Sequence, residues 1–116
     1  MAKDLQVSVL LDYYGVMLTQ KQHTLVELYY NQDFSLSEIA EIESITRQGA
    51  SDGIKRAESY LRELEEKLGM IKRDTHTVDC VKKIITAAEK IKLGTDAFKY
   101  AADIVKTAKK IEFQLR

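Results

Sequence analysis

Two helix-start signals follow one another closely in this sequence, and they constrain the fold more than any other feature. Ser35 and Glu38 form an S-x-x-E pattern, in which each side chain satisfies a backbone N–H group of the other residue at a helix start. Thr46 is a second N-cap candidate. We therefore expect one helix to begin at about Leu36 and a second at Arg47, joined by a tight turn. This arrangement is that of a helix-turn-helix.

The helix after Thr46 is predicted to bury one apolar face. Its apolar residues recur at alternating spacings of four and three, which is the spacing of a single helix face. They are Ala50, Ile54, Ala57, Leu61, Leu64 and Leu68. In the preceding helix, Ile39, Ala40 and Ile42 are expected to face inward. The pattern carries the second helix to about Leu68, further than a DNA groove requires.

The opposite face of this second helix is polar and partly basic. It carries Arg47, Gln48, Ser51, Asp52, Lys55 and Arg56. Such side chains hydrogen-bond to base edges and phosphates when the second helix of a helix-turn-helix enters the major groove. We predict these six residues as the DNA-binding site, with Lys55 and Arg56 acting mainly on phosphate and Gln48 and Ser51 on base edges.

Composition favours helices throughout the chain. The 116 residues include no proline and only five glycines, and 45% are hydrophobic, enough for the core of one domain. The fold class is therefore predicted as all-α. The one cysteine, Cys80, cannot form an internal disulfide, and no signal peptide or long apolar run is visible, so we expect a cytoplasmic protein with no membrane insertion.

Six helices are predicted. They span residues 4–14, about 20–30, from about 36, about 47–68, from 77 or 78 to Gly94, and from Thr95 to the end. Gly15 is expected to cap the first, Thr19 to start the second and Gly69 to stop the long helix, with residues 70–76 as a connector. We expect 1–70 to form a helix-turn-helix unit and 77–116 a helical hairpin packed on it, giving one globular domain.

The hairpin helices each carry an apolar stripe, predicted to face inward. The stripes consist of Val81, Ile84, Ile85, Ala88 and Ile91 in one helix, and Phe98, Ala101, Ala102, Val105, Ala108, Ile111 and Leu115 in the other. Together with Leu61, Leu64 and Leu68, these stripes need covering. We therefore expect a homodimer, since paired half-sites also favour two-fold symmetry.

Charge is distributed unevenly although the net charge is zero. Residues 1–76 hold nine Lys and Arg against thirteen Asp and Glu, whereas residues 77–116 hold nine against five. The lysines among residues 77–116 are Lys82, Lys83, Lys90, Lys92, Lys99, Lys106, Lys109 and Lys110. They form either the solvated face of two amphipathic helices or a surface for phosphates or an acidic partner. Nucleic-acid affinity comes largely from Lys and Arg. Residues 1–76, which contain the predicted helix-turn-helix, are acidic, so we expect them to bind DNA weakly on their own.

Several motifs in the first part of the chain occur together and in order. They are Tyr13-Tyr14-Gly15, Leu18-Thr19-x-Lys21-Gln22, Glu27-Leu28-Tyr29-Tyr30, Phe34-Ser35-Leu36-x-Glu38-Ile39-Ala40-Glu41, and Arg47-Gln48 through Ile54-Lys55-Arg56-x-Glu58. In these the chain resembles the YlxM family of bacterial helix-turn-helix proteins, whose reader is similar to region 4 of sigma factors. The resemblance implies a cytoplasmic regulator, linked to the signal recognition particle pathway through neighbouring genes.

The chain departs from that family pattern inside the reader. Ser44 stands where the turn usually has glycine, Gly49 and Gly53 replace alanine and asparagine, and Ser51 replaces a larger side chain. A non-glycine residue in a left-handed turn costs on the order of 1 kcal/mol. The departures lie in the turn and in the helix that is predicted to contact base edges. They therefore bear most on the expectation that this helix recognises a DNA sequence.

No pattern in the sequence points to catalysis. There is no glycine-rich phosphate loop, metal-ligand cluster or nucleophile motif, His23 and His76 are isolated, and Cys80 is expected to pack in the interior. We predict no enzyme activity, no cofactor and no metal. Three functions stay open: a regulator that binds double-stranded DNA, a protein-interaction module of the sigma region 4 type, and RNA binding through the basic C-terminal helices, where signal recognition particle components would be relevant partners.

Overall fold

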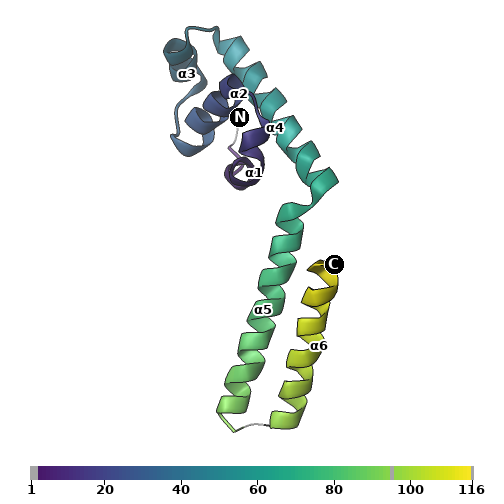
Figure 1. Ribbon diagram of the computed structural model, residues 1–116. Coiled ribbons are helices and arrows are strands. Elements are labelled where there is room, and N and C mark those ends of the chain that lie inside the picture. The colour runs from purple at the N-terminus through teal and green to yellow at the C-terminus, as the bar shows by residue number, and fades with distance from the viewer. Residues whose placement is uncertain (1–2, 95, 116) are drawn as a thin grey trace. The chain divides into compact units, whose positions relative to one another are not determined.

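The computed structural model describes residues 3–94 and 96–115, and every regular element among them is helical (Figure 1). The elements are α1 (Gln6–Tyr14), the 3-10 turn η1 (Gly15–Met17), α2 (Gln20–Val26), the π turn η2 (Glu27–Asn31), α3 (Leu36–Glu43), α4 (Arg47–Leu68), α5 (Met70–Lys92) and α6 (Ala97–Leu115). The all-α prediction is confirmed. The chain divides into two compact units, Met1–Met70 and Ile71–Arg116. The packing of the hairpin on the long helix stays a prediction.

The helix starts follow the local signals in the sequence. Ser35 and Glu38 form the expected capping box, with the Glu38 N–H donating to Ser35 Oγ at 3.1 Å and the Ser35 N–H donating to Glu38 Oε1 at 3.1 Å. Thr19 and Gln22 form a second capping box at the start of α2. Thr46 Oγ1 accepts a hydrogen bond from the third residue of α4. Each cap satisfies a backbone donor that a helix start leaves unpaired.

The inner stripe of α4 is the centre of the N-terminal unit. Ala50, Ile54, Ala57 and Leu61 are completely buried. Helices α1, α2 and α3 all contact α4, and in Figure 1 they gather on one side of it. Leu64 is half-buried and Leu68 is exposed, so the buried stripe ends before the helix does. The predicted extent of α4 is confirmed.

Other details of this unit differ from the sequence-based expectations. Ile42 is 52% exposed rather than inward. Gly15 is the C-cap of α1, as expected, with its N–H donating to the Leu11 carbonyl, but its φ of −57° is right-handed and the chain continues into η1. A side chain there would approach Leu11 Cδ1 and His23 Cδ2 at 3.2 Å, so close packing rather than turn geometry favours glycine. The second predicted helix ends at Val26 and continues as the π turn η2, which apolar spacing does not signal.

The turn of the helix-turn-helix contains a strained residue. Ser44 adopts the left-handed conformation with φ 57° and ψ 43°. The Ile45 N–H donates to the Ala40 carbonyl at 3.0 Å, which is the hydrogen bond of a left-handed helix ending. The turn geometry is therefore the one usually provided by glycine, here built with serine.

Ser44→Gly is expected to raise the free energy of unfolding by about 0.5–1 kcal/mol, because glycine adopts this conformation without a Cβ clash. The midpoint of urea unfolding measures the change. Ser44→Ala serves as the control, since alanine keeps the Cβ and should give no gain. A glycine variant that is no more stable than the alanine variant would contradict strain at this turn.

The junction after α4 differs from the predicted connector. Gly69, with φ 62°, ends α4 in a single left-handed residue, and α5 begins at once at Met70 instead of at Thr77 or Val78. The Met70 N–H donates to Tyr14 Oη at 3.1 Å, and the same hydroxyl donates to Glu65 Oε1 at 2.5 Å. A tyrosine from α1 thus supplies the acceptor at the start of α5, which local sequence cannot reveal.

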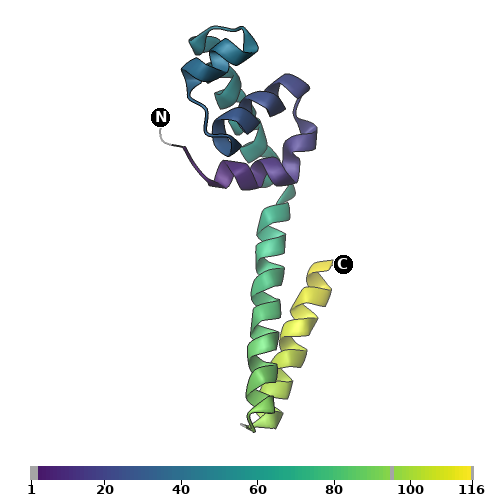
Figure 2. The same ribbon diagram turned by 90° about the vertical axis from the view of Figure 1, so that its left-hand side faces the viewer.

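The C-terminal unit is a hairpin in which α5 and α6 run side by side in opposite directions (Figures 1 and 2). Gln114 Nε2 joins the two helices, donating to Thr77 Oγ1 at 2.7 Å and to the Arg73 carbonyl at 3.1 Å. The Lys99 N–H donates to Asp96 Oδ1 at the start of α6. The predicted cap Thr95 lies outside the described residues.

The seam between these helices is not the predicted one. The buried and half-buried positions of the seam recur at spacings of three and four; they are Thr77, Cys80, Ile84, Ala87 and Ile91 on α5, and Tyr100, Ile104, Thr107, Ile111 and Gln114 on α6. Of the residues in the two predicted apolar stripes, only Ile84, Ile91 and Ile111 are at least half-buried. Each helix carries apolar residues on more than one face, and a single partner helix covers only one of them.

Candidate nucleic-acid interface

A small apolar cluster fixes α3 and α4 at the reader. It consists of Leu25, Tyr29, Ile39, Ala40, Ala50 and Ile54, drawn from α2, η2, α3 and α4. Phe34 and Ile45 pack against this cluster from the two connecting segments, and Leu36 packs against it from the start of α3. Because the inner sides of both helices are buried here, the remaining face of α4 is turned outward.

The predicted reading residues lie on that outward face. Arg47, Gln48, Asp52, Lys55 and Arg56 are exposed. Ser51 is half-buried, because it lies nearer to the boundary with the buried stripe. The face therefore offers two arginines, a lysine, an amide and a hydroxyl from consecutive turns of one helix, and this set can donate hydrogen bonds to base edges and to phosphate oxygens.

One contact within the face affects what it can read. Gln48 Nε2 donates to Asp52 Oδ1 at 3.0 Å, one helical turn away. This bond holds the amide of Gln48 along the helix surface. To hydrogen-bond an external group, Gln48 would have to give up this bond, and the carboxylate of Asp52 would repel an anion placed beside it.

The structure adds Lys21 to this surface, a residue that the sequence-based prediction missed. A hollow of about 360 Å³ is lined by Thr19, Lys21, Gln22 and Leu25 of the α2 region and by Gly49, Asp52, Gly53 and Arg56 of α4. The Thr19 cap places Lys21 in the first turn of α2, and α2 packs against α4. The Thr19 cap can be seen in the sequence, but the packing of α2 against α4 cannot. Lys21 and Arg56 bring two positive charges to this hollow, and Asp52 brings one negative charge.

The two unusual glycines of α4 have a structural explanation in the same place. A Cβ on Gly53 would lie 2.6 Å from Leu25 Cδ1, so glycine lets α2 approach α4 closely. A Cβ on Gly49 would lie 3.0 Å from Thr46 Oγ1, the capping atom of the helix. These glycines thus give up helix propensity for close packing beside the reading face.

A polar network holds α4 below the reading face. Arg62 donates to Asp4 at 2.8 Å and to Glu58 at 3.0 Å, and the Tyr30 hydroxyl donates to Glu58 at 3.0 Å. The hydrogen bond from Arg62 holds the pKa of Asp4 below its usual value. Burial, followed by the hydrogen bond to Glu58, raises the pKa of Tyr30. These contacts join α4 to the segment before α1 and to η2.

Electrostatics set a limit on the reader unit. Residues 1–70 hold seven Lys and Arg against twelve Asp and Glu, a net charge of −5. Arg47, Lys55 and Arg56 form a local basic strip within this acidic unit. The strip can contact phosphates, but the unit as a whole supplies little of the long-range attraction that nucleic acids require.

Cys80 lies in the hairpin seam and is 3% exposed, in agreement with a packing role. Its Sγ lies 3.7 Å from His76 Nε2, a neighbour one helical turn away that the sequence-based reading treated as isolated. No group of three or more potential metal ligands occurs within residues 3–94 and 96–115. None of the helices in the described part of the chain is long and apolar enough to cross a bilayer.

Comparisons with known proteins agree with this arrangement. The family model of UPF0122, described as "Putative helix-turn-helix protein, YlxM / p13 like", matches residues 1–100. A UPF0122 protein of Thermoanaerobacter sp. strain X514 is 44% identical over 90 residues, covering 78% of this chain and 71% of the relative. A UPF0122 protein of Acetivibrio thermocellus is 35% identical over 112 residues, covering 97% of this chain and 96% of the relative.

Proposed function

Since this chain belongs to the UPF0122 family of YlxM/p13-like helix-turn-helix proteins, we propose that it is a DNA-binding regulatory protein rather than an enzyme. The observation that carries the proposal is the outward face of α4. This face is polar and exposed, and the opposite face is completely buried at Ala50 and Ile54. The second helix of a helix-turn-helix uses such a face in the major groove.

Five of the six residues of this face have a proposed contact to DNA. Arg47, Lys55 and Arg56 bind phosphate oxygens, and Gln48 and Ser51 contact base edges once the bond from Gln48 to Asp52 is released. We propose a cytoplasmic location, because a DNA reader must share a compartment with the chromosome. A regulatory link to the signal recognition particle pathway is part of the proposal, and it rests on the family resemblance alone.

The double variant Arg47→Ala/Arg56→Ala is expected to weaken binding to duplex DNA by at least about tenfold, because two phosphate contacts are lost. Fluorescence anisotropy with a pool of random-sequence duplexes at low salt measures the affinity. Lys67→Ala is the control, since it also removes a positive charge from α4 but lies far along the helix, paired with Glu63 at 2.8 Å. Unchanged affinity in the double variant would remove α4 from the DNA interface.

We also propose that the chain forms a homodimer through the hairpin. On one side of the seam, most of the exposed positions are apolar: Val78, Val81, Ile85 and Ala88 on α5, and Ala101, Val105 and Ala108 on α6. Helical periodicity places both stripes on the same side of the hairpin. Ile85 is 50% exposed and Val105 is 54% exposed, and within α6 no described residue is fully buried.

A second copy of the hairpin fits this apolar side. In a two-fold dimer each copy contributes the same surface to the interface, so the apolar side of one copy would cover the apolar side of the other. Four helices would then share a core that two helices leave open. A dimer also gives two reading helices, as two half-sites on DNA require.

A further inference from the structure

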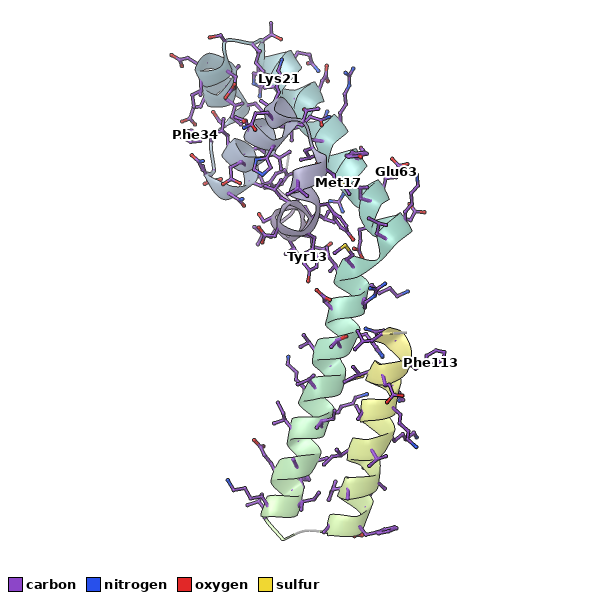
Figure 3. All side chains as sticks on the ribbon, in the orientation of Figure 1. Tyr13, Met17, Lys21, Phe34, Glu63 and Phe113 are labelled. Atoms are coloured by element: carbon purple, nitrogen blue, oxygen red, sulfur yellow. The ribbon has the colours of Figure 1, made fainter. Side chains whose placement is uncertain are left out.

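The hairpin has a second surface, on the side of the seam away from the apolar stripes. A groove of about 450 Å³ opens to solvent between the two helices. Its charged and polar lining consists of Lys82, Lys83 and Thr86 from α5 and Tyr100, Asp103, Lys106, Thr107 and Lys110 from α6. A second hollow beside it is lined by Lys106, Lys109 and Lys110 together with His76, Gln114 and Phe113, whose ring points away from α5 (Figure 3).

The lysines of this surface have no anionic partners among the described residues. Lys82, Lys83, Lys106, Lys109 and Lys110 make no ion pair within 4.0 Å there, and Asp103 is the one acidic residue in the lining. By contrast, Lys3, Arg62 and Lys67 of the N-terminal unit each contact a carboxylate. The hairpin thus presents its positive charge to external anions.

Charge over the whole chain points to the kind of anion. Residues 71–116 hold eleven Lys and Arg against six Asp and Glu, a net charge of +5, which balances the −5 of residues 1–70. The reader unit offers side chains that can distinguish bases but lacks the positive charge that provides most of the affinity for nucleic acids. The hairpin has positive charge but no set of side chains that distinguishes bases. Its lysines are flexible point charges that bind phosphates whatever the base sequence.

We propose that the lysine-lined groove of the hairpin binds the phosphate backbone of double-stranded DNA and so supplies sequence-independent affinity to the helix-turn-helix. The proposal rests on the DNA-binding function proposed above. The shape of the groove agrees with a polymer backbone, because the groove is open to solvent and carries four lysines, whereas sites for small ligands are enclosed. Lys106 and Lys110, one turn apart on α6, would contact neighbouring phosphates.

The test uses the full chain and the salt dependence of its binding to random-sequence duplex DNA. Lys106→Ala/Lys110→Ala is expected to lower the slope of log affinity against log salt concentration by about 2, since each phosphate contact contributes about 0.9. Affinity at 0.1 M salt should fall at least about tenfold. The matched control is Lys67→Ala/Lys92→Ala, which removes two positive charges from residues that do not line the groove. Lys106→Arg/Lys110→Arg should keep the slope.

The possible outcomes separate this proposal from that for the reader. An equal slope in Lys106→Ala/Lys110→Ala and the charge-matched control would overturn the groove proposal. A lower slope in that variant, together with unchanged binding by Arg47→Ala/Arg56→Ala, would support the groove and overturn the reader. Absence of any duplex binding by the unmodified chain would overturn both. Binding to a structured RNA but not to duplex DNA would overturn the assignment of DNA as the groove's partner.

Discussion

Ile54→Ala is expected to lower the free energy of unfolding of the helix-turn-helix unit by about 3 kcal/mol, within the usual range of about 2–5 kcal/mol for such truncations. Ile54 is 0% exposed and belongs to the apolar cluster that joins α2, α3 and α4. Its removal would leave a cavity directly beneath the reading face. The loss is large against the roughly 5–15 kcal/mol that stabilise a typical domain, so DNA binding should fall with it.

Tyrosine fluorescence during urea unfolding measures this change, because five of the six tyrosines lie within residues 1–70. Ile54→Val is the graded control, with an expected loss of about 0.5–1.5 kcal/mol. Ile42→Ala is the control on the neighbouring helix, and it should change stability by no more than about 0.5 kcal/mol because Ile42 is exposed. Equal midpoints for Ile54→Ala and Ile42→Ala would contradict the central position of Ile54.

The sequence predicts the reader well because its determinants are local. The capping boxes at Thr19 and Ser35 act within four residues, and the apolar spacing of α4 reflects one buried face along a single helix. The start of α4 at Arg47 and its end at Leu68 follow from the Thr46 cap and from Gly69. Where two neighbouring signals agree, as they do here, the boundaries of the element are determined.

The hairpin is predicted less well because its determinants are distant in sequence. The start of α5 depends on the hydroxyl of Tyr14, far back in α1, which accepts the Met70 N–H. The seam runs through Cys80 and Ala87, whereas the more hydrophobic Val81 and Ile85 are exposed. Hydrophobicity alone predicts that the more apolar stripe of α5 is buried. The stripe that is buried is the one that faces α6.

The candidate sites show the same division. The six residues of the α4 face come from one helix, so helical periodicity was enough to group them, and their role in DNA binding stays a prediction. Lys21 comes from another helix and joins Arg56 only because α2 packs closely at Gly53. The lysine groove likewise combines α5 with α6. The lysines of both helices are visible in the sequence, but the pairing of α5 with α6 decides which of them line one groove.

Ile85→Asp is expected to convert the proposed homodimer into a monomer, halving the mass measured in solution. Ile85 lies in the middle of the apolar side of α5 and is 50% exposed in the single chain, so aspartate is tolerated there when no second copy is present. In the dimer the carboxylate would face its own symmetry copy in an apolar interface, where an unpaired charge costs far more than the lost isoleucine contributes.

Sedimentation equilibrium at low micromolar concentration provides the measurement, and circular dichroism should show the same helix content in both proteins. Thr86→Asp is the matched control, because it adds the same charge one residue further along, on the groove side of α5, and should leave the dimer intact. A mass of one chain for the unmodified protein, unchanged on tenfold concentration, would contradict the homodimer. The apolar side of the hairpin would then need another cover, and each reading helix would bind DNA as a single module without a symmetric half-site.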